Sequence, residues 1–177
     1  MIEYLKGEPK NIDGVMDLLS KIRKQFKEEG LDIYQDDEYP TKEILLNDLK
    51  NNEGTLVALN DDKVVGYIAF SNENDFFDDC FGGYPEDYLK KYSLDIYKGK
   101  FIGLARLMVD PNYQNKGIGT NIFKKLEQYF INYVIIFLVD KNNLNAQKLY
   151  KKLGYNCLSL ENFSFGEYYV YIKRNFD

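Results

Sequence analysis

Gln114-Asn115-Lys116-Gly117-Ile118-Gly119-Thr120 is the most informative run of this chain, because it joins an apolar segment to an amphipathic one. The apolar segment ends at residues 106–109, and the amphipathic segment begins near Ile118, so a strand feeds a glycine-bearing turn that opens a helix. The first N–H groups of a helix have no partner within it and lie at the positive end of its dipole. Two glycines remove side chains that would keep an anion away. The run therefore predicts a cradle for a phosphate or pyrophosphate, with a turn that merely needs glycine as the alternative.

Length and composition indicate one soluble domain over residues 1–177. The net charge of −5, from 23 basic and 28 acidic residues, argues against a nucleic-acid partner. Histidine is absent, which excludes Ser-His, Cys-His and His-metal mechanisms within this chain. Cys80 and Cys157 are too few for a thiolate zinc site, and they fit a reducing compartment. No signal core and no run of ~18 apolar residues is present, so we expect no membrane partner and a cytoplasmic location.

Hydrophobic periodicity predicts helices, an antiparallel meander, and then a strand–helix–strand crossover, hence a mixed α/β sheet. Residues 72–98 mix aromatic and acidic side chains and are predicted to be an irregular connection with a short helix near 85–92. The other predicted elements are strands at 2–6, 54–59, 64–70, 101–109, 133–139, 155–160 and 166–173, and helices at 12–29, from Pro40 onward, from the glycine turn to about 132, and at 143–153.

Two familiar nucleotide motifs do not match the glycine run. A P-loop requires a lysine after its last glycine, whereas Lys116 precedes Gly117. A dinucleotide fingerprint requires three glycines near the start of the fold, and this run has two glycines in mid-chain.

A second segment, residues 143–155, reads Asn-Leu-Asn-Ala-Gln-Lys-Leu-Tyr-Lys-Lys-Leu-Gly-Tyr. Asn143 can cap a helix here, and Tyr150 follows seven residues later, about two turns along the same face. Both side chains can then point towards one bound molecule, unless Tyr150 is simply a half-buried core tyrosine.

Together the two segments resemble the Gcn5-related N-acetyltransferase (GNAT) superfamily. Gln114-x-x-Gly117-x-Gly119 after residues 107–109 resembles its acetyl-CoA motif, and residues 143–155 resemble its N-x-x-A-x-x-L-Y-x-x-L-G-[FY] motif. The resemblance implies an acyl-CoA N-acyltransferase fold: a mixed, mostly antiparallel central sheet with helices on both faces and two splayed strands.

The resemblance also implies an acetyl-CoA site without a metal. The pantetheine arm would pair with backbone groups of Leu107 and Val109 and bond Asn143, and the pyrophosphate would lie on N–H groups from Asn115 to Thr120 beside Lys116. The cofactor-binding residues implied in this way are Leu107, Met108, Val109, Gln114, Asn115, Lys116, Gly117, Ile118, Gly119, Thr120 and Asn143.

The chemistry implied is direct attack of an amine on the thioester carbonyl. A backbone N–H near Leu107 or Met108 would donate to the developing oxyanion. Tyr150, whose phenol has an ordinary pKa of ~10, would protonate the leaving thiolate as general acid.

The chain departs from the superfamily pattern at the general base. Residues 101–106 contain no carboxylate, and Leu138 stands where some members hold a glutamate. Asp140 reads as a solvated turn residue. Ordered water or a carboxylate from Asp36, Asp37, Glu38 or the acidic insertion 73–87 could take the amine proton, and none of these is assigned. The acidic segments form either a negative rim that attracts a cationic acceptor or plain solvated loops.

The predicted activity is transfer of an acetyl group from acetyl-CoA to a primary amine of a small molecule, such as a polyamine, amino sugar, amino acid or antibiotic. Two alternatives stay open: a protein or peptide N-acetyltransferase, which needs an open groove, and a non-catalytic acyl-CoA sensor, which the missing strand carboxylate favours. Homodimers are common among proteins of this resemblance.

Overall fold

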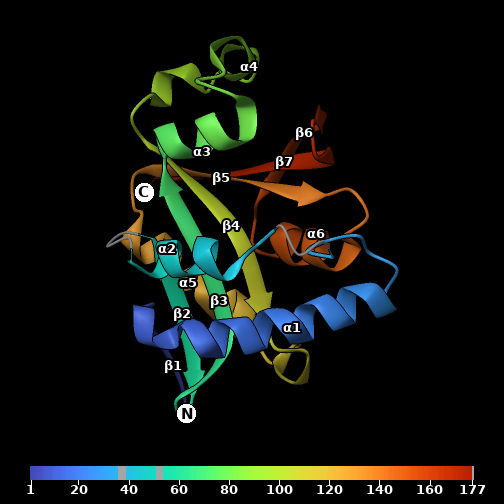
Figure 1. Cartoon of the computed structure of the whole chain (residues 1–177). Helices are drawn as coiled ribbons and strands as arrows, with labels where there is room; N and C mark the ends of the chain where they lie inside the picture. The colour runs from blue at the N-terminus through green and yellow to red at the C-terminus, as the bar shows by residue number, and fades with distance from the viewer. Residues whose placement is uncertain (36–38, 51–53, 177) are drawn as a thin grey trace. The chain divides into compact units, whose positions relative to one another are not determined.

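The computed structural model describes residues 1–35, 39–50 and 54–176 (Figure 1). Within these ranges the strands form one mixed, mostly antiparallel sheet, confirming the predicted fold class. Their spatial order is β1 (Ile2–Lys6), β2 (Thr55–Asn60), β3 (Lys63–Asn72), β4 (Phe101–Val109), β5 (Tyr133–Asp140), β7 (Gly166–Asn175) and β6 (Asn156–Phe163). The α-helices are α1 (Ile12–Glu28), α2 (Lys42–Lys50), α3 (Glu73–Phe81), α4 (Glu86–Lys91), α5 (Ile118–Tyr129) and α6 (Leu144–Lys152).

Internal contacts group the chain into two compact units. The first unit comprises Met1–Ala69 and Arg106–Lys125, and the second comprises Phe70–Ala105 and Leu126–Asp177.

The first unit is built on the β2–β3 hairpin and on α1. Asp61 and Asp62 join the two strands with φ angles of +47° and +65°, the left-handed conformation that tight hairpin turns require. The apolar positions of α1 recur at spacings of three and four, and they are buried against the hairpin. A Cβ on Gly14 would lie 2.7 Å from a methyl of Val64, so α1 approaches β3 closely at that glycine. The helix, strands and hairpin predicted here are confirmed.

The second unit is built around β5, whose apolar run is covered on both faces as predicted. Phe101–Leu104 pair with Val134–Phe137 in parallel, and β7 pairs with β5 on the other side in antiparallel register. Alternate residues of these strands face opposite helices. Tyr150 of α6 contacts Phe137 and Tyr171 on one face, whereas Ile136 and Val170 belong to a core cluster with α3 on the other. Figure 1 shows α3 and α6 on opposite sides of β5 and β7.

The prediction for residues 72–98 was partly wrong, because the segment contains a full helix, α3, as well as the expected short helix α4. The Asn72 side chain caps α3 by accepting the N–H of Asp75 at 3.1 Å. Gly82 closes the helix in the left-handed conformation, with φ +70°. Phe76 and Phe77 are buried in the core of the second unit. Phe76 and Phe77 therefore serve packing, whereas the neighbouring Asp75, Asp78 and Asp79 are exposed.

Helix α5 ends at Tyr129, about one turn before the predicted end near residue 132. Asn132 has a φ of +68°, and its backbone N–H donates to the carbonyl of Asn175 at 2.7 Å. These residues thus lead into β5 outside the helix.

Candidate functional site

A buried carboxylate holds the start of the turn between β4 and α5. Asp110 is wholly buried, and its side chain accepts the N–H of Asn112 at 3.0 Å and the ammonium of Lys21 at 3.1 Å. Its own N–H donates to the carbonyl of Val65 at 2.9 Å. Burial alone would raise the pKa of the Asp110 carboxyl, but Asn112 and Lys21 outweigh it and hold this pKa below its usual range. Sequence reasoning missed Asp110, although an aspartate before proline is a turn signal.

Gln114 braces the same turn with its side chain. Its amide nitrogen donates to the carbonyl of Val109 at 3.0 Å and to the side-chain oxygen of Gln25 at 2.8 Å. Gln25 returns a hydrogen bond to the Gln114 oxygen at 3.1 Å. This pair ties the turn to α1 and to the end of β4. The cofactor-binding role of Gln114 stays a prediction. Its side chain already has a structural role in bracing the turn.

The glycine turn contains two left-handed residues and leads directly into α5. Asn115 and Gly117 have φ angles of +60° and +84°, and concave rows of N–H groups form where such left-handed residues alternate with right-handed ones. The Asn121 N–H donates to the Gly117 carbonyl at 2.9 Å, so Gly117 immediately precedes the first helical turn. The N–H groups of Ile118, Gly119 and Thr120 fall in that turn, where the helix itself offers no acceptor. A Cβ on Gly117 would meet no heavy atom within 4 Å, which leaves open space beside the turn.

Lys116 brings positive charge to the turn. Its ammonium donates to the carbonyl of Asn112 at 2.8 Å and lies 5.3 Å from the centre of the Tyr113 ring. The side chain of Ile118 is only 3% exposed, so its contribution to a ligand would come from its backbone N–H. The structure thus gathers the predicted residues 114–120 on one turn and the first turn of α5.

The end of β4 carries the three strand residues of the prediction. Met108 is buried in the core cluster of the first unit, with Leu45 and Tyr67 among its members. Leu107 and Val109 are half-buried. Met108 could therefore serve a ligand through its backbone alone, and the cofactor roles of all three residues stay predictions.

A charged cluster beside this strand was not predicted. Arg106 has a φ of +56°, a left-handed conformation inside a strand, and its guanidinium makes two hydrogen bonds to Asp48, at 2.9 and 2.7 Å. Tyr39 accepts from Arg106 at 2.7 Å, and Tyr67 donates to Asp48 at 2.8 Å. Burial disfavours the charge on Arg106, but Tyr39 and Asp48 outweigh it and raise the guanidinium pKa. This paired cluster holds the strand in its unusual conformation directly before Leu107.

In the second unit, Asn143 caps α6 as predicted. Its side-chain oxygen accepts the N–H of Ala146 at 3.1 Å. The N–H of Asn143 itself donates to the carbonyl of Asp140 at 3.0 Å, which anchors the cap to the end of β5. The oxygen of the amide is thereby engaged, so its amino group is the part suited to donate to a ligand.

Tyr150 lies seven residues further along α6 and is 6% exposed. Its ring centre is 4.6 Å from that of Phe137, 5.8 Å from that of Tyr171 and 6.4 Å from that of Tyr155. Burial raises the pKa of the Tyr150 phenol above its ordinary value. At neutral pH the phenol therefore keeps its proton, as a general acid must, although the same burial suits a core tyrosine.

Two positions considered for a general base have structural surroundings of their own. Leu138 packs against the core cluster that contains α3, and Asp140 accepts the N–H of Asn142 at 2.7 Å as a turn residue. Asp36, Asp37 and Glu38 lie outside the described residues.

Across residues 1–35, 39–50 and 54–176, no three or more His, Cys, Asp or Glu side chains are grouped so that they could hold a metal ion. Among those same residues, none of the helices combines the length and the apolar character needed to cross a membrane.

The mixed, mostly antiparallel sheet and the glycine turn that opens α5 are the features that the resemblance to the acyl-CoA N-acyltransferase fold implies. The profile of the Acetyltransferase (GNAT) family matches residues 15–155, and this chain belongs to that family. The predicted family is thereby confirmed.

Relatives and solved structures agree with this assignment. The chain is 31% identical over 117 residues to the spermine/spermidine N(1)-acetyltransferase of Bacillus subtilis strain 168, covering 62% of this chain and 73% of that protein. A GNAT acetyltransferase structure from Streptococcus agalactiae superposes with a TM-score of 0.79 at 18% identity, covering 98% of this chain and 95% of the other. The PaiA N-acetyltransferase of Thermoplasma acidophilum, solved in complex with coenzyme A, gives a TM-score of 0.69 at 17% identity and covers 98% and 99%. The two structures show the fold that this chain shares.

Proposed function

We propose that this acetyltransferase moves the acetyl group of acetyl-CoA to a primary amine of a small molecule, with residues 1–177 acting as one catalytic domain. The observation that carries the proposal is the turn at 115–120, where left-handed residues and the start of α5 present N–H groups to an anion. The coenzyme A pyrophosphate is such an anion. A relative named for spermine and spermidine supports a small amine as acceptor.

In the proposed reaction the amine nitrogen bonds to the thioester carbonyl carbon, and the carbon–sulfur bond breaks. A backbone N–H near Leu107 or Met108 donates to the oxyanion. Tyr150 gives its proton to the leaving thiolate, and the amine proton passes to water or to a carboxylate that we leave unassigned. The raised pKa of Tyr150 supports this role, because it keeps the phenol protonated. The Asn143 amino group would bond the pantetheine arm.

A panel of amines tests the proposal by release of the coenzyme A thiol. We expect turnover with an aliphatic oligoamine. The amount of acetylated amine formed should equal the amount of coenzyme A thiol released. A panel that includes amino sugars, amino acids and a lysine-containing peptide also separates small-molecule from peptide acceptors. Coenzyme A binding without turnover of any amine would contradict the proposal and favour an acyl-CoA sensor.

A further inference from the structure

The end of α3, Tyr88 of α4 and the tip of the β6–β7 hairpin line an open pocket of about 550 Å³ within the second unit. Its walls combine aromatic rings with acidic side chains. The aromatic members are Phe81, Tyr88, Phe163 and Phe165, and the acidic members are Asp78, Asp79 and Glu161. Among the residues that the structure describes, no lysine or arginine lines the pocket. This combination suits an organic cation, because ammonium groups bind both carboxylates and the faces of aromatic rings.

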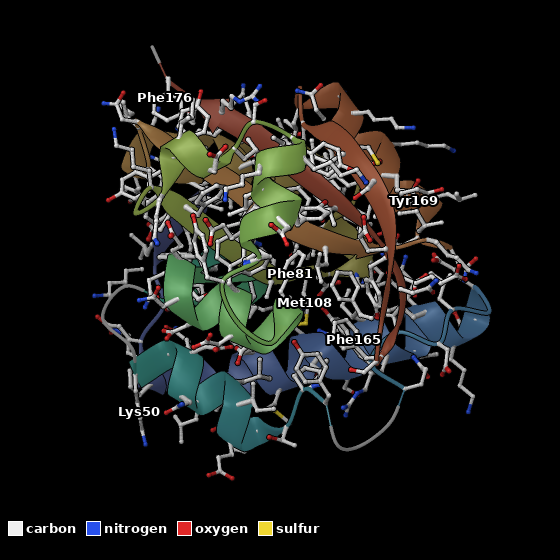
Figure 2. All side chains as sticks on the ribbon, turned by 90° about the horizontal axis from the view of Figure 1, so that it is seen from above. Lys50, Phe81, Met108, Phe165, Tyr169 and Phe176 are labelled. Atoms are coloured by element: carbon white, nitrogen blue, oxygen red, sulfur yellow. The ribbon has the colours of Figure 1, made fainter. Side chains whose placement is uncertain are left out.

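The aromatic walls are fixed by contacts with one another. Phe81 lies 5.4 Å from Phe163 and 5.4 Å from Tyr88 between ring centres. Phe163 stacks on Phe165 at 5.2 Å, and Tyr88 shares a hydrogen bond of 2.7 Å with Ser159. Figure 2 labels Phe81 at the end of α3 and Phe165 on the hairpin tip. The pocket is therefore held in shape from both of its sides.

The carboxylates of the pocket have no basic partner among the described residues. Within residues 1–35, 39–50 and 54–176, no ion pair joins Asp78, Asp79 or Glu161 to a basic side chain. Lys90 of α4 pairs with Glu86, and Lys141 of the β5–α6 turn pairs with Glu167. The ammonium of Lys91, also on α4, lies 5.2 Å from the centre of the Tyr92 ring. The negative charge of the pocket is thus left to attract a ligand from solution.

Strand register connects the pocket to the β5–α6 turn. Glu161 pairs with Tyr168 across β6 and β7, and Tyr168 pairs with Asp140 at the end of β5. Residues paired in this way lie on one face of the sheet, roughly 5 Å apart from strand to strand. Asn143 follows Asp140 by three residues. A ligand in this pocket would therefore lie on the α3 face of the sheet, near the turn that carries Asn143.

We propose that this pocket binds an unbranched aliphatic amine with two or more ammonium groups and so selects the acceptor, an inference that rests on the proposed function. Carboxylates lie on both sides of the pocket, two on α3 and one on β6. One ammonium group of the ligand can therefore bind on each side, while the aliphatic segment between the two groups lies against the rings. A divalent metal fits less well, because these carboxylates do not converge into a group that could hold one.

The test is calorimetry of the full chain with spermidine at low salt, comparing variants of matched charge. Asp79→Asn with Glu161→Gln removes two charges of the pocket, and Asp87→Asn is the control, because Asp87 is exposed on α4 and lies outside the lining. We expect the double variant to weaken binding about three- to tenfold, and Asp87→Asn to change it less than about 1.5-fold. Phe165→Leu keeps an apolar side chain but removes an exposed ring, and it should weaken binding about twofold or more.

Three results would overturn the proposal: no spermidine binding to the unaltered chain, equal losses in the double variant and in Asp87→Asn, or unchanged binding in the double variant. Weaker spermidine binding in the double variant together with unchanged binding in Phe165→Leu would also count against the proposal. Such a result would indicate a general effect of charge that does not involve the aromatic rings. Binding is measured without acetyl-CoA, so it tests the pocket even if no amine is acetylated. Binding without turnover would contradict the proposed function alone.

Discussion

Substitution of Gly117 tests the proposed cofactor site most specifically, because the conformation and the surroundings of this residue are both known. Its φ is +84°, and an added Cβ would meet no heavy atom within 4 Å. Any side chain at this position therefore costs about 1–2 kcal/mol in backbone strain without a steric clash. Gly30 has a φ of +71° and the same open surroundings at the end of α1, so Gly30→Ala is the control for strain.

Gly117→Glu adds a charge to this strain. A carboxylate about 6 Å from a doubly negative pyrophosphate costs about 1.4–2.8 kcal/mol if the effective dielectric constant is about 40–80. This repulsion weakens coenzyme A binding about 10- to 100-fold. Gly117→Gln has nearly the same size without the charge, so the ratio of the two dissociation constants isolates the electrostatic part.

Calorimetry with coenzyme A measures both variants at two salt concentrations. We expect Gly117→Glu to bind far more weakly than Gly117→Gln, and the gap to narrow at high salt because the repulsion is screened. Thermal unfolding should show similar losses for Gly117→Gln and Gly30→Ala. If Gly117→Glu bound coenzyme A as tightly as the unaltered chain, the pyrophosphate would not lie at this turn.

Other perturbations address other parts of the account. Tyr150→Phe should lower kcat by about 100-fold with coenzyme A affinity nearly kept, as measured by steady-state kinetics and calorimetry, and unchanged kcat would remove Tyr150 from the mechanism. Asp110→Asn should destabilise the fold by about 1–3 kcal/mol at neutral pH in urea unfolding, because it weakens the hydrogen bond to Lys21. Because the pKa of Asp110 is held low in the folded state, this stabilisation is present above the unfolded pKa of about 3.9 and lost as the pH falls through the folded pKa; a gap that did not shrink in acid would contradict this linkage. Gly103→Ala should cost about 1–3 kcal/mol of unfolding free energy, because its Cβ would meet the Phe76 ring; an unchanged midpoint would mean that α3 does not pack there.

Local signals made much of the fold predictable. The uninterrupted β-branched and aromatic run at residues 133–139 predicts a strand covered on both faces, and the spacing of apolar residues in 12–29 predicts a helix; both are confirmed. Helix α3 carried signals as well, an asparagine cap at Asn72 and a glycine at Gly82. These two helix signals did not decide the prediction, because the segment mixes aromatic and acidic residues without a clear helical spacing. Which of its residues are buried depends on tertiary packing.

The candidate site likewise has some features that depend on local sequence and others that depend on tertiary packing. The glycine turn and the cap at Asn143 depend on neighbours within a few residues, so their geometry follows from the sequence. The bond between Asp48 and Arg106 spans 58 positions, and that between Gln25 and Gln114 spans 89. Nothing in the local sequence pairs such residues, since the contact exists only after the sheet and helices have packed.

Amide NMR of the uniformly ¹⁵N-labelled chain during a coenzyme A titration tests the central claim most directly, because it observes the proposed N–H donors themselves. The amide signals of Gly117, Ile118, Gly119 and Thr120 should show the largest shifts, saturating together with the calorimetric binding curve. The signal of Gly30, in the same left-handed conformation at the end of α1, should stay in place. Saturable binding that leaves the four turn amides unshifted would contradict the assignment of this turn as the pyrophosphate site.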